Sequence, residues 1–274
     1  MSSTNHIVRN RLDFLHNQLV NPDKAPLADD GHHINNPSEL NILHISQYDL
    51  EHWDVDTNPE LLFEPMSLTE IQKYPINPDE MDEDQDWATG SARDDSDLLE
   101  IRGLQEVRIP NLFLLNYTLC GYYPDASLRL SRELILETER DHSQDAHPLV
   151  VMTGYQPCNG KEDRILYGEL VLVFCAMQNR AKQPKAKYEE EAEELSNMPE
   201  KLRLRYHDER RFPDEVHFPV LLLSFVVSQH GRMLYPCMDV ERMVIRQSRL
   251  YSFEREESAL LDLFARFLLS LPGA

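Results

Sequence analysis

Histidine and acidic side chains stand at metal-ligand spacing between residues 142 and 147. His142, Asp145 and His147 form an H-x-x-D-x-H pattern, and imidazole and carboxylate groups are ordinary ligands of divalent metals. The stretch from Asp141 to Asp145 is polar and typical of a surface loop, and a loop does not by itself supply the fixed geometry of a metal site. The three residues are therefore a weak metal candidate, and the sequence predicts a loop without a metal or other cofactor.

Three carboxylates lie beside apolar runs in the C-terminal half. Asp214 precedes the run 218–227, and Asp239 and Glu241 are followed by Arg242. This order resembles that of PD-(D/E)xK nucleases, in which carboxylates on adjacent strands hold magnesium and a lysine assists the attacking water. Arg242 stands where the lysine would be, and a guanidinium hardly deprotonates. The same pattern arises if the three carboxylates are simply polar residues of turns between strands. A metal-dependent, nuclease-like or hydrolytic α/β domain is therefore the alternative hypothesis.

A basic cluster lies within the charged stretch 180–215, where blocks of Lys and Arg alternate with blocks of Glu. Its members are Arg203, Arg205, His207, Arg210 and Arg211. The cluster has the chemistry to grip an anion, but balancing the neighbouring Glu runs on the surface is the more ordinary use of such residues. The sequence also lacks the GxGxxG and GxxxxGK[ST] phosphate loops, the GxSxG elbow and the HExxH zinc motif.

The four cysteines are scattered and lie in or beside apolar runs: Cys120, Cys158, Cys175 and Cys237. No two form a CxxC pair. A chain of 274 residues is long enough to build a hydrophobic core without a disulfide framework. The spacing predicts buried, reduced thiols that behave as small apolar side chains.

The charge of the chain is strongly acidic and unevenly distributed. Formal net charge is −21, and residues 1–98 carry 21 acidic against 5 basic side chains. Nucleic acids bind proteins largely through Lys and Arg, and anionic membrane surfaces attract the same residues. The charge therefore argues against a nucleic-acid or membrane partner and favours a basic protein partner.

The longest apolar stretch, 218–227, is about half of a membrane span, and the first residues lack the apolar core of a secretory signal. We expect a cytoplasmic or nuclear protein.

The first third of the chain is predicted to contain one helix and an acidic arm. Residues 1–20 carry apolar side chains at helical spacing and are predicted to form an amphipathic helix that packs on the core. Residues 21–97 contain seven prolines and the acidic run 79–86, which indicates an arm or linker of low order. Bulky apolar residues in this arm are candidate partner-binding anchors, and packing on their own domain is the alternative: Trp53, Leu61, Leu62 and Phe63.

Residues 98–274 are predicted to form an α+β domain with a charged insertion at 180–215. The sheet is expected to be largely antiparallel or mixed, with five to six strands, and a C-terminal amphipathic helix carries the stripe from Leu260 to Leu271. The run 165–177 is so apolar that it reads as a central strand. The run 109–115 is a short helix or strand. The run 128–136 is predicted to be a half-buried strand, with a helix as the alternative. The remaining predicted strands are 148–152, 218–227, 233–235 and 243–245.

One stretch of about 35 residues, from Phe218 to Phe253, resembles small proteins of filamentous fungi that have no assigned role. The resemblance implies a fungal origin and an uncharacterised family. It carries no motif of known function, and no active-site residue is transferred from it.

These observations favour a non-enzymatic, intracellular regulatory or protein-interaction protein. In this hypothesis the α+β body is a scaffold, and the acidic arm and the charged insertion supply the contacts to a protein partner.

Overall fold

The computed structural model describes residues 3–19, 33–34, 36–52, 61–75, 95–106, 131–138, 147–185, 191, 194, 210–227, 229–254 and 258–273. The predicted run 109–115, the acidic run 79–86 and most of the insertion 180–215 lie outside these residues. In the part of the chain that is described, no helix is both long enough and apolar enough to cross a lipid bilayer.

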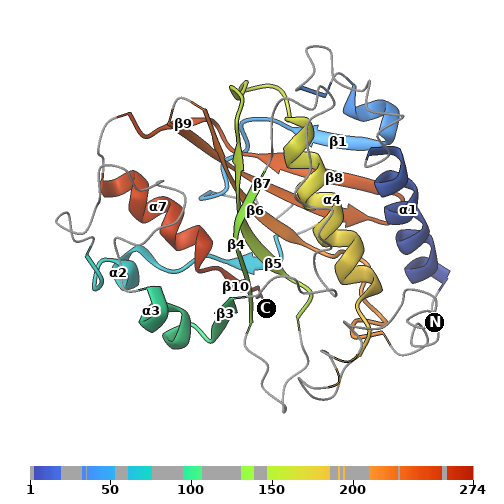
Figure 1. Ribbon diagram of the computed structural model, residues 1–274, viewed down its shortest axis with the longest axis horizontal. Coiled ribbons are helices and arrows are strands. Elements are labelled where there is room, and N and C mark those ends of the chain that lie inside the picture. Colours follow the sequence, from blue (N-terminus) through green and yellow to red (C-terminus); the bar gives the residue numbers. More distant parts are fainter. Residues whose placement is uncertain are drawn as a thin grey trace.

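A mixed sheet forms the centre of the molecule (Figure 1). Its strand order is β1-β8-β7-β6-β5-β4-β3, with β9 paired to β7. The strands are β1 Ile42–Ile45, β3 Leu104–Glu106, β4 Ser131–Thr138, β5 Val150–Gln156, β6 Val220–Val226, β7 His230–Asp239, β8 Arg242–Gln247 and β9 Tyr251–Ser252. The pairs β1–β8 and β5–β6 are parallel and the others are antiparallel. The predicted α+β class is confirmed, but the sheet of eight strands is larger than the five to six predicted, partly because β1 comes from the acidic first third.

Helices cover both faces of the sheet (Figure 1). Helices α1 (Ser3–Leu19) and α4 (Tyr167–Lys182) lie on one face, and α2 (Leu68–Ile71), α3 (Asp95–Ile101) and α7 (Ser258–Leu268) lie on the other. Strand β6 shows the consequence for the sequence. Leu222 packs in the core under α1 and α4, whereas Leu221 and Leu223 pack in the core under α7. A strand buried on both faces needs no polar alternation, which is why its sequence is almost continuously apolar.

The run 165–177, predicted as a central strand, belongs to helix α4, and that prediction is wrong. The helix connects the parallel strands β5 and β6, which a short turn cannot join. It is buried on nearly all sides because the sheet covers one side and α1 packs against it. An all-round apolar helix has no amphipathic stripe. Only the length of the run, which exceeds that of most strands, pointed to a helix.

The N-terminal helix α1 is an integral part of one core. Its apolar residues are fully buried: Val8, Leu12, Leu15 and Leu19. Arg9 donates from Nε to the Ala181 carbonyl (3.1 Å) and from Nη2 to the Phe212 carbonyl (2.5 Å), while its guanidinium lies over the Phe218 ring. Burial and the nearby Arg210 lower the pKa of Arg9 to about 10. These contacts fix α1 to both ends of the charged insertion 180–215.

The described parts of residues 21–97 also pack on the body. Strand β1 extends the sheet, and Leu50 is buried in the core under α7. Strand β2 (Phe63–Glu64) pairs with β10 (Leu271–Pro272), the short strand that follows helix α7. The short 3-10 helix η2 (Pro37–Leu40) precedes β1. The predicted C-terminal helix is confirmed as α7, with Phe264 and Phe267 buried against the sheet.

Candidate functional site

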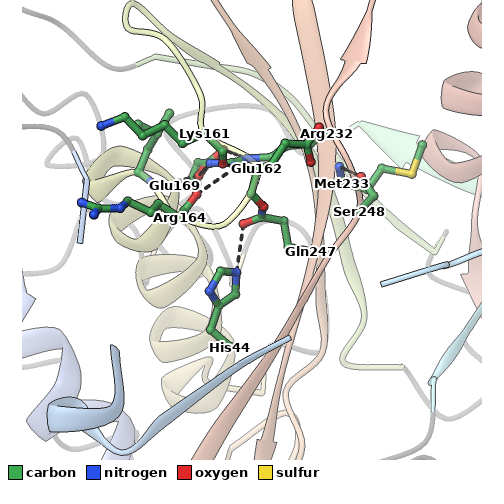
Figure 2. A network of polar contacts seen from close by, with 10 residues as sticks. His44, Lys161, Glu162, Arg164, Glu169, Arg232, Met233, Gln247 and Ser248 are labelled. Atoms are coloured by element: carbon green, nitrogen blue, oxygen red, sulfur yellow. Dashed lines mark hydrogen bonds and ion pairs between the residues drawn. The ribbon is translucent and has the colours of Figure 1, made fainter. Parts of the chain in front are cut away.

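A buried polar network in the core joins helix α4 to strand β7 (Figure 2). Arg232 of β7 donates from Nε to Oε1 of Glu169 (2.8 Å) and from Nη2 to Oε2 (2.5 Å). Both side chains are 0 % exposed. Glu169 lies in the first turn of α4, and its Oε2 also accepts from the backbone N–H of Leu166 (2.8 Å). The carboxylate therefore caps the helix and neutralises Arg232 at the same time.

Arg232 also closes the loop that leads into α4. Its Nη1 donates to the backbone carbonyls of Lys161 (2.7 Å) and Arg164 (2.9 Å). A buried charge is tolerated when its hydrogen-bonding groups are satisfied, and these carbonyls supplement the carboxylate in that role.

A second branch of the network reaches the edge strand β1. Gln247 of β8 donates from Nε2 to the Glu162 carbonyl (2.8 Å), so its Oε1 is the atom that faces Nε2 of His44 (3.0 Å). Because Oε1 can only accept, His44 carries its proton on Nε2. Burial lowers the pKa of His44, and the hydrogen bond to Gln247 acts in the opposite direction. The neutral histidine thus connects β1 to the same loop that Arg232 holds.

Another buried ion pair lies at the far end of α4. Arg180 donates from Nη1 to Oε2 of Glu137 on β4 (2.7 Å), and both residues are almost fully buried. Gln105 of β3 donates to the other carboxylate oxygen (3.1 Å), and Nη1 of Arg211 lies 3.6 Å from Oε2. The guanidinium groups of Arg180 and Arg211 both lie over the ring of Phe212. This pair fixes α4 to the β3–β4 edge of the sheet.

The carboxylates of Glu169 and Glu137 are enclosed by protein, and their oxygens already accept hydrogen bonds from guanidinium and amide groups. A catalytic acid or base must reach the proton of a bound substrate, and Glu169 and Glu137 instead face their own arginines. Both pairs act on the fold by setting the position of α4 against the sheet. Two members of the predicted basic cluster are described. Arg211 lies close enough to Glu137 to balance its charge, and the backbone of Arg210 forms an isolated β-bridge with Pro184. The other members lie outside the described residues: Arg203, Arg205 and His207.

The three predicted carboxylates of the alternative hypothesis are not gathered into a metal site. Asp239 ends β7 and pairs with Arg242 (2.8 Å). Glu241 lies in the turn between β7 and β8, and its backbone carbonyl accepts from Asn41. Asp214 lies in the loop beside Arg9. Within the described residues, which include all three, no group of three or more His, Cys, Asp or Glu side chains could hold a metal ion.

The weak metal candidates and the candidate partner anchors are described only in part. His147 lies just before β5, its Nδ1 accepts from the Leu149 N–H, and burial lowers its pKa. The other two metal candidates, His142 and Asp145, lie outside the described residues. Among the partner anchors, Trp53 also lies outside them. Leu61 and Leu62 are half-buried against the core under α7. Phe63 is 2 % exposed, with its ring 4.9 Å from that of Tyr235. Phe63 therefore packs on its own domain and presents no free anchor.

The buried thiols should be chemically inert in the folded protein. Burial raises the pKa of Cys175 and of Cys237 to about 12, from 9.0. Because each pKa unit lowers the thiolate fraction about tenfold, we expect iodoacetamide at pH 8 to alkylate both cysteines roughly a thousandfold more slowly in the folded protein than in urea. Mass spectrometry of the two tryptic peptides over time measures the rates. Equal rates in the folded and unfolded protein would contradict the expectation.

Three comparisons, with protein-family models, with curated proteins and with solved structures, find no match to this chain.

Proposed function

We propose that this protein is a non-enzymatic regulatory or interaction protein of the cytoplasm or nucleus, and that it binds a basic protein partner. The main contact in this proposal is the acidic segment 76–94, and the charged insertion adds to it. The observation that carries the proposal is that the body fixes both ends of this segment. Helix α2, just before it, packs on α7, and α3 begins directly after it.

The ends of the acidic segment are held by specific contacts on one face of the sheet. Before it, Ile71 is fully buried in the core under α7. After it, Leu98 is buried in the same core, and Arg102 donates to the Leu269 carbonyl just beyond α7 (3.2 Å). The two anchors, Ile71 and Leu98, therefore lie in the same core under α7. A chain segment that is tied to a folded body at both ends has less entropy to lose on binding than a free tail has.

Charge is concentrated in the same part of the chain. Residues 61–106 carry 13 acidic and 3 basic side chains, a net charge of −10 within a total of −21. A local excess of one sign accelerates encounter with partners of the opposite sign and gives an affinity that salt weakens. These are the properties expected of a docking segment for a basic protein.

The proposal is tested by removing the charge without shortening the chain. Wild type and variants are titrated against a fluorescein-labelled oligolysine peptide, and fluorescence anisotropy gives the affinity at low and physiological salt. With each lost surface contact costing about 0.2–1 kcal/mol, we expect the following six-site variant to bind about tenfold or more weakly than wild type: Asp79→Asn, Glu80→Gln, Asp82→Asn, Glu83→Gln, Asp84→Asn and Asp86→Asn.

A second six-site variant in the charged insertion is the matched control, because it changes the net charge by the same amount: Glu189→Gln, Glu190→Gln, Glu191→Gln, Glu193→Gln, Glu194→Gln and Glu200→Gln. The proposal predicts a clearly smaller loss for this control. An equal loss in both variants would mean that net charge, rather than the anchored segment, determines binding, and the proposal would then be wrong.

A further inference from the structure

The two ends of the charged insertion contact each other. The N–H of Arg211 donates to the Gln183 carbonyl (2.9 Å), and Pro184 and Arg210 form an isolated antiparallel β-bridge. We name this contact the neck of the insertion and define it as residues 181–184 and 210–213. A two-stranded contact this short is only marginally stable in water. Contacts from other parts of the fold must therefore keep the neck closed.

Helix α1 supplies contacts to both halves of the neck. Arg9 donates from Nε to the Ala181 carbonyl (3.1 Å) in the first half and from Nη2 to the Phe212 carbonyl (2.5 Å) in the second. One helical turn earlier, Asn5 donates from Nδ2 to the Pro213 carbonyl (2.9 Å). Arg9 is only 6 % exposed, so water does not readily take the place of either carbonyl. The fixed fork of a guanidinium lets this one side chain join two separate chain segments.

The neck itself buries little apolar surface. Its buried apolar residues are Ala181 and Phe212, and most of its other residues are partly or fully exposed. Strand β6, which follows the neck, is by contrast buried and apolar almost throughout. Segments with few buried apolar contacts open locally at a lower free energy than the core does. The polar contacts from Arg9 therefore carry much of the weight in keeping the neck closed.

A second set of contacts reaches the neck from the sheet and does not involve α1. Glu137 of β4 accepts from Arg180 (2.7 Å), and Nη1 of Arg211 lies 3.6 Å from the same carboxylate oxygen. Arg180 also donates to the side-chain oxygen of Gln183 (2.8 Å). These contacts remain when Arg9 is replaced. Loss of the Arg9 contacts should therefore loosen the neck without unfolding the sheet.

We propose that helix α1 is a clasp on the charged insertion: Arg9 keeps the neck closed, and the neck opens as a unit, separately from the sheet, when this contact is broken. Coupling between two sites is reciprocal, so a closed neck also strengthens the docking of α1. The N-terminal helix thereby sets the distance between the two ends of the insertion. This role of α1 does not depend on which partner the protein binds.

Arg9→Lys tests the clasp, because lysine keeps the positive charge but lacks the fork that reaches both carbonyls. Hydrogen exchange followed by mass spectrometry reports on the amides of Gln183 and Arg211, which donate within the neck and to the end of α4. We expect these amides to exchange about tenfold or more faster than in wild type, since hydrogen bonds from a charged donor are among the stronger ones. Peptides from β6 and β7 should exchange at the wild-type rate.

The matched control is Arg11→Lys, the same substitution two positions along the same helix. Arg11 donates to the Leu40 carbonyl and lies over the Phe14 ring, with no printed contact to the neck. It should leave exchange in the neck unchanged. Wild-type exchange in the neck of Arg9→Lys, an equal increase in Arg11→Lys, or a parallel increase in neck and sheet would each overturn the proposal.

A disulfide across the neck gives a second test that does not need Arg9 to be changed. Pro184→Cys and Arg210→Cys place two thiols at opposed positions of the β-bridge. By reciprocity, the oxidised form should show exchange in α1 about fivefold or more slower than the reduced form. Equal exchange of α1 in the two forms would mean that the neck and α1 are not coupled, and the proposal would then be wrong even if Arg9→Lys does not fold.

Discussion

Glu169→Gln should destabilise the protein by about 3–5 kcal/mol, because it leaves the Arg232 guanidinium buried without a counter-charge. Glutamine has nearly the same size and can still accept a hydrogen bond, so the change isolates the loss of charge. Both partners are 0 % exposed, and water cannot replace the missing carboxylate. Urea unfolding followed by circular dichroism gives the free energy of unfolding. The melting temperature should fall by roughly 2–4 °C for each kcal/mol lost.

An exposed ion pair in the same sheet provides the control. Arg242 pairs with Asp239 at the surface, and Arg242→Gln should cost no more than about 1 kcal/mol. Replacing both buried partners, Glu169→Met with Arg232→Met, should recover much of the stability lost by Glu169→Gln, since an apolar pair leaves no charge unpaired. A loss below about 1 kcal/mol for Glu169→Gln would mean that the pair does not hold α4 on the sheet as described.

Phe63→Ala should destabilise the protein by about 3–5 kcal/mol, the usual cost of emptying an aromatic site in a core. The ring contacts those of Tyr235 and Phe267 edge-on, with centroids at 4.9 Å and 6.0 Å. Chemical unfolding of the variant measures the loss. Leu68→Ala on the exposed side of α2 is the control for stability, and its effect should stay near 0.5 kcal/mol or less.

This experiment separates the two interpretations of residues 61–63. A core residue affects the free energy of unfolding and leaves the affinity of the folded protein for a basic peptide unchanged. A partner anchor does the reverse. If Phe63→Ala keeps the wild-type stability and weakens peptide binding, the packing of this segment on its own domain would be refuted.

The position of the first third in the fold also decides how its function can be studied. Helix α1 and strand β1 contribute to the core under α4, and Phe63 and Ile71 contribute to the core under α7. Deleting residues 1–98 would therefore open both cores and remove an edge of the sheet. Charge-neutralising substitutions in the full chain avoid this loss, because they leave the buried apolar area intact.

Local sequence patterns were sufficient for several elements. The runs 218–227, 233–235 and 243–245 correspond to β6, β7 and β8, and the apolar stripe near the C-terminus corresponds to α7. These segments have the period or the turn residues that a strand or an amphipathic helix requires, so their neighbours in sequence already specify them. The uneven charge is likewise a property of composition and needs no coordinates.

Only the tertiary structure decided that 165–177 is a helix, that Phe63 is buried and that Glu169 meets Arg232. Glu169 and Arg232 lie 63 positions apart in the chain, and the sequence around either residue does not predict that the two will form an ion pair. A helix enclosed by a sheet and a second helix loses its polar face, and with it the period that identifies helices in a sequence. The physical reason is the same in each case: burial is created by segments distant along the chain, and burial determines which side chains become core, ion pair or surface.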